Sequence, residues 1–157
     1  MEIFVMRHGH AEPEAPSDRL RALSVQGESE VARSLSRHKS ELEKIQLAVV
    51  SPYVRAQSTY QVARTALPAH EFVESELVVP CADPQKLIDY LYEIQQKGVE
   101  SVLLVSHQPL VGTLVDRLCG LEPGAYRMGT AALAAIDTDV VAANCGELRW
   151  LHQAEPA

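Results

Sequence analysis

Short apolar runs alternate along this chain with longer segments in which apolar residues recur every three or four positions. The short runs are typical of strands buried in a parallel sheet, and the longer segments are typical of helices packed against such a sheet. The pattern predicts strands at residues 3–6, 47–50, 71–73, 102–105, 131–136 and 147–151. It predicts helices from 24 to about 38, from 52 to about 66, over 84–94 and over 109–119.

The regular alternation of strands and helices indicates the fold class. Strand–helix–strand units place their helices on the faces of a sheet, so we expect a three-layer α/β/α sandwich with a mainly parallel central sheet. Two strands are weakly marked: 71–73 is short, and the alanines of 131–135 also favour a helix. No repeat or linker divides the 157 residues, and we therefore expect residues 1–157 to form one domain.

Three of the predicted strands end in charged or reactive side chains. Arg7-His8-Gly9 follows the first strand, Arg55 lies in the first turn of the helix after the second, and His107 follows the fourth. The carboxyl ends of parallel strands share one edge of the sheet, where α/β proteins bind their ligands, so we expect these side chains to meet. Pro52 and Pro109 are expected to begin helices at the same edge, and helix N-termini attract anions.

The residue types gathered at this edge suit a phosphoryl group. A guanidinium forks toward phosphate oxygens, an imidazole nitrogen is a nucleophile or a proton carrier, and a glycine lets the backbone approach a ligand. Each residue alone has a plainer explanation, as an exposed arginine or a histidine satisfied in the core. Together they predict a site for a compact dianion, formed by Arg7, His8, Arg55 and His107.

Composition narrows the range of partners. The chain carries 14 basic and 21 acidic residues and a net charge of −7, whereas a nucleic-acid-binding surface needs a basic excess. No apolar run approaches the ~20 residues that a membrane-spanning helix requires. The N-terminus has no signal-peptide pattern. We therefore expect a cytoplasmic protein that binds neither nucleic acid nor a membrane.

Histidines and cysteines do not form a metal-binding pattern in this sequence. The cysteines Cys81, Cys119 and Cys145 are widely spaced, and we expect reduced, partly buried thiols. A metal at His8 and His107 would be repelled by the two arginines predicted beside them, and it would also need carboxylate or thiolate ligands. The sequence thus predicts a site that uses neither a metal nor a cofactor.

The chain resembles the histidine phosphatase superfamily, also called phosphoglycerate mutase-like, over its whole length. The Arg-His-Gly signature of the family matches Arg7-His8-Gly9, its second arginine matches Arg55, and its second histidine matches His107. Within the superfamily the chain is most similar to the small SixA-type phosphohistidine phosphatases, which share the motif at residues 106–112. The resemblance implies a phosphoglycerate mutase-like fold and a hydrolase that dephosphorylates proteins.

The resemblance also implies a role for each site residue. His8 would attack phosphorus and carry the phosphoryl group as phosphohistidine, which water would then hydrolyse. Arg7, Arg55 and His107 would hold the non-bridging oxygens, and Gly9 would be a further substrate contact. His8 must be neutral at its attacking nitrogen, so we expect a backbone carbonyl near Gly9 to bind the other ring nitrogen.

The leaving group and the substrate stay less defined. Many members of the superfamily protonate an alcohol leaving group with a carboxylic acid near the third strand, where Glu74 and Glu76 are the candidates here, with solvated loop carboxylates as the alternative. Arg21 is a candidate contact of the phosphoryl group or of the protein substrate, with an exposed basic residue as the alternative.

The short third-strand segment predicts an open site, which suits a phosphohistidine on a phosphorelay or phosphotransfer protein. A small-molecule phosphomonoesterase of the sugar-phosphate type and a phosphate-binding regulatory module are the alternatives.

Overall fold

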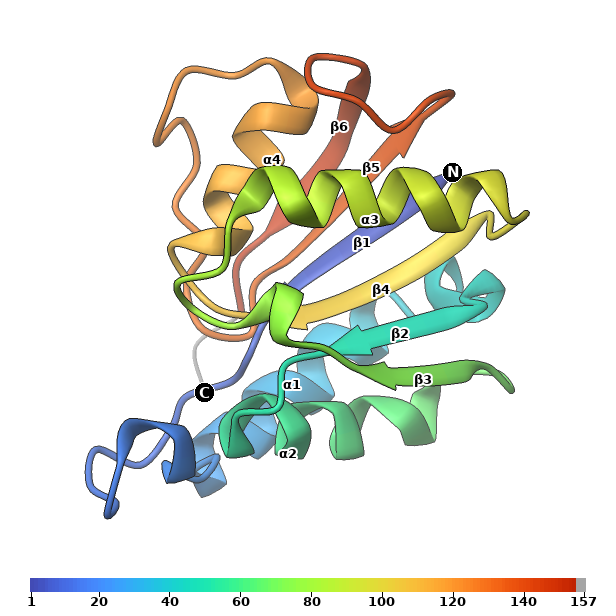
Figure 1. Cartoon of the computed structure of the whole chain (residues 1–157). Coiled ribbons are helices and arrows are strands. Elements are labelled where there is room, and N and C mark those ends of the chain that lie inside the picture. Colours follow the sequence, from blue (N-terminus) through green and yellow to red (C-terminus); the bar gives the residue numbers. More distant parts are fainter. Residues whose placement is uncertain (155–157) are drawn as a thin grey trace.

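Helices cover both faces of a six-stranded sheet (Figure 1). The structure is a computed structural model, and it describes residues 1–154. The strands are β1 (Glu2–Arg7), β2 (Leu47–Val50), β3 (Glu71–Glu74), β4 (Ser101–Ser106), β5 (Leu133–Thr138) and β6 (Gly146–His152). The α-helices are α1 (Val25–Arg37), α2 (Val54–Ala63), α3 (Pro84–Gln96) and α4 (Leu110–Cys119). Short 3₁₀ helices are η1 (Asp18–Leu20), η2 (Glu41–Lys44), η3 (Arg64–Ala66) and η4 (Glu76–Val78).

The sheet has the strand order β3-β2-β4-β1-β5-β6. Strands β1 to β4 run parallel to one another, whereas β5 pairs antiparallel with β1 and with β6. Helices α3 and α4 cover one face and α1 and α2 cover the other (Figure 1). The three-layer α/β/α sandwich with a mainly parallel sheet, expected from the sequence, is confirmed.

Burial on both faces explains why the central strands are continuously apolar. In β1, Ile3 and Val5 pack into the core beneath α3 and α4, and Phe4 and Met6 pack into the core beneath α1 and α2. All six residues of β4 are buried in the same way. A strand that buries both faces has no solvent-facing side, so polar residues are confined to its ends. This confinement places the charged residues at the carboxyl edge of the sheet.

The two helices expected to begin at Pro52 and Pro109, α2 and α4, begin later than the sequence predicts. α2 begins at Val54 rather than Pro52, because Ser51 Oγ accepts the backbone N–H of Tyr53 at 3.2 Å and holds a turn before the helix. Pro109 is the N-cap of α4 rather than its first residue. Despite these shifts, both helix N-termini lie at the ends of β2 and β4 as expected.

The predicted strand at 131–136 is correct in type but begins too early. Ala131 adopts a left-handed backbone with φ of 59°, which a strand residue cannot have, and β5 starts at Leu133. The alanines that follow form a strand rather than a helix, because they pair with β1 on one side and β6 on the other. Tertiary pairing thus overrides the helix propensity of alanine.

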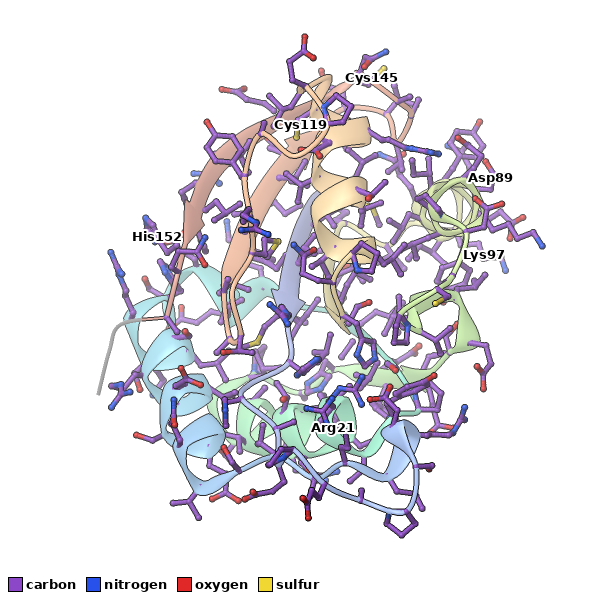
Figure 2. All side chains as sticks on the ribbon, turned by 90° about the vertical axis from the view of Figure 1, so that its left-hand side faces the viewer. Arg21, Asp89, Lys97, Cys119, Cys145 and His152 are labelled. Atoms are coloured by element: carbon purple, nitrogen blue, oxygen red, sulfur yellow. The ribbon has the colours of Figure 1, made fainter. Side chains whose placement is uncertain are left out.

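Cys119 and Cys145 lie away from the carboxyl edge (Figure 2), whereas Cys81 lies between η4 and α3. Cys81 and Cys145 are exposed and Cys119 is half-buried, so partial burial was a correct expectation for Cys119 and a wrong one for the other two. All three are free thiols. Figure 2 shows Cys119 and Cys145 at the end of the molecule opposite to Arg21. Within residues 1–154, no helix is both long enough and apolar enough to cross a membrane.

Candidate active site

The four residues predicted from the strand ends come together at the carboxyl edge of the sheet. Arg7 is level with Ser106 in the pairing of β1 with β4, and the backbone N–H of His8 donates to Ser106 O at 3.0 Å. The rings of His8 and His107 are 5.0 Å apart between centroids. Arg55 reaches across from α2, with its Nε 3.2 Å from His8 Nε2. His8, Arg55 and His107 are buried, and Arg7 is half-buried.

The hydrogen bonds of His8 fix its tautomer. Nδ1 lies 2.7 Å from Gly9 O, and a carbonyl oxygen can only accept, so Nδ1 carries the proton. Nε2 then holds a lone pair, which accepts from Arg55 Nε. A backbone carbonyl near Gly9 is the partner expected from the sequence. The chemically important result is a buried imidazole whose unprotonated nitrogen, Nε2, faces a guanidinium.

Burial keeps both site histidines neutral. Burial is the largest cause that lowers the pKa of His8 to about 4, and the charges of Arg55 and Arg7 lower it further against the opposing effect of the Gly9 hydrogen bond. Burial likewise lowers the pKa of His107 to about 3, with contributions from His8 and Arg55. A lowered pKa means that the neutral form persists as the pH falls from 8 toward 5. His8 is therefore unprotonated at Nε2 over the whole physiological range.

This neutrality is testable in the unliganded protein. In a ¹⁵N-labelled sample followed by NMR, the His8 imidazole should show no protonation between pH 8 and 5.5, and its midpoint should lie near pH 4. The resonance is assigned by its loss in the His8→Gln variant. A midpoint close to 6.5, the ordinary histidine value, would contradict the arrangement described here.

Gly9 holds His8 in place by close packing. A Cβ added to Gly9 would lie 2.8 Å from Gly27 O and 2.8 Å from Val31 Cγ2. The absence of a side chain therefore allows the backbone after β1 to pack closely against α1. The Gly9 N–H donates to Thr59 Oγ1 at 3.1 Å, and Thr59 in turn donates to Arg55 O at 2.8 Å. These contacts tie the turn after β1 to α2. A substrate contact by Gly9 stays a prediction.

The sequence analysis missed Asp18, which fixes the position of Arg55. Arg55 Nη1 donates to Asp18 O at 2.7 Å, and Nη2 donates to Asp18 Oδ2 at 3.2 Å. The other carboxylate oxygen, Oδ1, accepts from Arg21 Nη1 at 3.1 Å. The only sequence signal is an acidic residue next to the basic residues of 19–21, and that pattern does not say that the loop folds over the sheet edge.

Asp18 is a carboxylate rather than an acid donor at neutral pH. Burial alone raises its pKa, but the hydrogen bond from Arg21 and the charge of Arg55 lower the pKa overall. The Asp18 side chain is 59% exposed, so its ion pair with Arg55 lies at the mouth of the site. The charge of Arg21 is among those that lower the pKa of His8, which shows that Arg21 lies within electrostatic range of His8.

Ser51, also missed from the sequence, binds the second histidine. Its Oγ lies 2.7 Å from His107 Nε2 and accepts the Tyr53 N–H. The Tyr53 ring meets His107 edge-on, with ring centroids 5.0 Å apart. Two nitrogens of the cluster, Arg7 Nε and His107 Nδ1, are buried and have no hydrogen-bond partner within residues 1–154.

Neither candidate general acid joins the cluster. Glu76 pairs with Arg19 at 3.1 Å, and Arg19 in turn lies over the Tyr53 ring at 5.3 Å. Glu74 is exposed at the end of β3. Glu76 therefore lies at the rim of the site, and Glu74 is an exposed residue of the edge strand β3. Their role as acids stays a prediction that the described contacts do not favour.

Comparisons with known proteins identify relatives over nearly the full length, although no family model matches the chain. It is 38% identical over 165 residues to the phosphohistidine phosphatase SixA homolog of Haemophilus influenzae, covering 99% of this chain and 97% of that protein. It is 39% identical over 145 residues to the phosphohistidine phosphatase SixA of Escherichia coli, covering 88% and 86%.

A solved structure agrees with these relatives. The protein histidine phosphatase SixA complexed with tungstate superposes with a TM-score of 0.88 at 34% identity, over 98% of this chain and 97% of that one. Sequence identity above 30% over most of both chains thus accompanies a shared fold. The chain therefore belongs to the SixA family of phosphohistidine phosphatases, within the histidine phosphatase superfamily.

Proposed function

We propose that this chain hydrolyses the phosphoryl group of phosphohistidine on another protein, through a phosphohistidine intermediate on His8. The observation that carries the proposal is the neutral His8 whose Nε2 lone pair lies 3.2 Å from Arg55 Nε. A proton held on Nδ1 by Gly9 O leaves Nε2 ready to attack. The names of the relatives, which are phosphohistidine phosphatases, support the same reaction.

In the first step His8 Nε2 forms a bond to phosphorus as the bond from phosphorus to the substrate nitrogen breaks. The developing charge on the non-bridging oxygens is stabilised by Arg55 and Arg7, whose positions are fixed by hydrogen bonds. In the tautomer in which the Ser51 hydroxyl donates to His107 Nε2, the proton of neutral His107 lies on Nδ1 and can donate to a phosphoryl oxygen.

In the second step water attacks phosphorus, the bond to His8 Nε2 breaks, and inorganic phosphate leaves. The two buried N–H groups without partners in residues 1–154, on Arg7 and His107, would both be satisfied by phosphoryl oxygens. The solved relative forms a complex with tungstate, a tetrahedral oxyanion of the kind that this cluster suits. No step of this scheme draws on a metal or a cofactor.

The carboxylates at the rim of the site are engaged by arginines, and this favours a phosphohistidine substrate over a phosphate ester. An alcohol leaving group needs a proton from a nearby acid, whereas an imidazole leaves readily once its own ring is protonated. Asp18 is held ionised by two arginines, and Glu76 is paired with Arg19. We therefore rank the sugar-phosphate type of phosphomonoesterase below the phosphohistidine phosphatase. A phosphorelay or phosphotransfer domain is the proposed substrate, and the cytoplasm is the proposed location.

A direct comparison of substrates tests this function. The protein is incubated with a histidine-phosphorylated phosphotransfer domain and, separately, with p-nitrophenyl phosphate, and phosphate release is measured. We expect kcat/KM for the phosphoprotein to exceed that for the ester by at least about 100-fold. The His8→Ala variant corrects for spontaneous hydrolysis of phosphohistidine. Faster turnover of the ester with no release from the phosphoprotein would overturn the proposal.

A further inference from the structure

A groove of about 570 Å³ opens beside the cluster, on the side of β5. It lies between the start of α4 and the segment that enters β5, and it reaches Arg7 at its inner end. Its lining residues are Arg7, Gln108, Pro109, Arg127, Met128 and Gly129. We propose that this groove binds an acidic side chain that the substrate protein presents next to its phosphohistidine, with Arg127 as the recognising residue. This inference rests on the proposed function and deepens it.

Charge is the first reason to expect an acidic occupant. Two of the six lining residues are arginines, and none of the six is acidic. The chain as a whole has a net charge of −7, so this cationic groove contrasts with the rest of the molecule. A carboxylate approaching the groove would meet a guanidinium and the N-terminal end of α4, both of which attract anions. A lysine or arginine in the same place would be repelled.

The backbone that carries Arg127 is held in place. Arg7 Nη1 donates to Met128 O at 3.0 Å, and the Gly129 N–H donates to Gln153 Oε1 at 2.8 Å. The side-chain amide of Gln153 also donates to Arg127 O. Met128 is buried beside this segment. The exposed Arg127 side chain therefore projects from a fixed position, which lowers the entropy lost on binding.

Arg127 lies next to the phosphoryl site rather than inside it. The charges that lower the pKa of His8 are those of Arg55, Arg7 and Arg21, and Arg127 is not among them. Arg7 belongs to both regions, because it faces the cluster and lines the groove. A substrate whose phosphohistidine reaches His8 would thus place a neighbouring residue of the same surface in the groove. Arg127 is a specificity residue for that neighbour, and the chemical steps do not need it.

Two synthetic phosphohistidine peptides test this inference. They have the same length and differ only in the residues flanking the phosphohistidine, which are glutamates in one peptide and glutamines in the other. We expect the wild-type protein to favour the glutamate peptide by about 5- to 10-fold in kcat/KM, mainly through KM, as is typical of a charge pair at the rim of an interface. Added salt should reduce this preference.

Variants of Arg127 show whether the groove causes the preference. Arg127→Gln should reduce the preference to less than about twofold, and Arg127→Glu should remove or reverse it. Arg64→Glu is the matched control, because it makes the same change of charge at an exposed arginine of η3, away from the lining residues of the groove. This control should keep the wild-type preference. Circular dichroism checks that each variant is folded.

The outcomes separate this inference from the proposed function. If the wild-type protein hydrolyses both peptides at equal rates, or if Arg127→Glu keeps the preference for glutamate, the acidic-side-chain inference is wrong and the phosphatase function stands. If the protein releases phosphate neither from the peptides nor from a histidine-phosphorylated domain, the proposed function fails and the inference fails with it.

Discussion

Replacing His8 with alanine should lower the turnover of a histidine-phosphorylated domain by at least about 10⁴-fold, because the nucleophile of a covalent mechanism has no substitute. The nearest ring, that of His107, is 5.0 Å away between centroids, and its Nε2 is engaged with Ser51. The measurement is phosphate release under saturating substrate, corrected for spontaneous hydrolysis. Circular dichroism and thermal unfolding show whether the variant keeps its fold.

A second histidine variant separates loss of the nucleophile from a general effect of removing an imidazole. His70 lies just before β3 and bonds Tyr60 through Nε2 at 2.6 Å, outside the catalytic cluster. His70→Gln should keep activity within about threefold of the wild-type protein. Full activity of His8→Ala would show that the mechanism is wrong, whatever the result for His70→Gln.

Replacing Arg55 with alanine should lower kcat/KM by about 10²- to 10³-fold, the range typical of removing one preorganised group that stabilises transition-state charge. Arg55 contacts His8 through Nε and binds Asp18 through both terminal nitrogens. Its loss removes a positive charge from the site and removes two of the hydrogen bonds that hold Asp18. Steady-state kinetics with a phosphohistidine protein measure the effect.

Arg55→Lys distinguishes charge from geometry. A lysine keeps the positive charge, but its single ammonium cannot contact His8, the backbone carbonyl of Asp18 and the Asp18 carboxylate at once. We expect this variant to recover less than about a tenth of the lost activity. Arg64→Lys, the same change at an exposed arginine on the chain segment after α2, should be neutral. Activity of Arg55→Ala within tenfold of the wild-type value would contradict the role given to this residue.

The position of the cluster was predictable because the buried central strands restrict where charged residues can lie. An apolar run that is buried on both faces can place a charged residue only at its ends, so Arg7 and His107 had to lie at the sheet edge. Arg55 followed from its place in the first turn of a helix at the same edge. Parallel pairing of β1, β4 and β2 then brought the three ends together.

Other features depend on contacts that no local pattern reveals. Asp18, Ser51 and Thr59 are common polar residues in the sequence, and each acquires its role because a loop or helix packs it against the cluster. The antiparallel pairing of β5 with β1 and with β6 was also unpredictable, since an apolar run has the same composition in either direction. The late start of α2 reflects a single side-chain hydrogen bond to Tyr53.

A single-turnover experiment reveals whether a covalent intermediate forms on His8. Excess enzyme is mixed with a ³²P-labelled phosphohistidine domain and quenched in alkali within milliseconds to seconds. We expect label to appear transiently on the enzyme as an acid-labile, alkali-stable phosphohistidine, which mass spectrometry assigns to His8 and which His8→Ala lacks. Release of phosphate with no labelled enzyme above background, or label on another residue, would contradict the covalent mechanism.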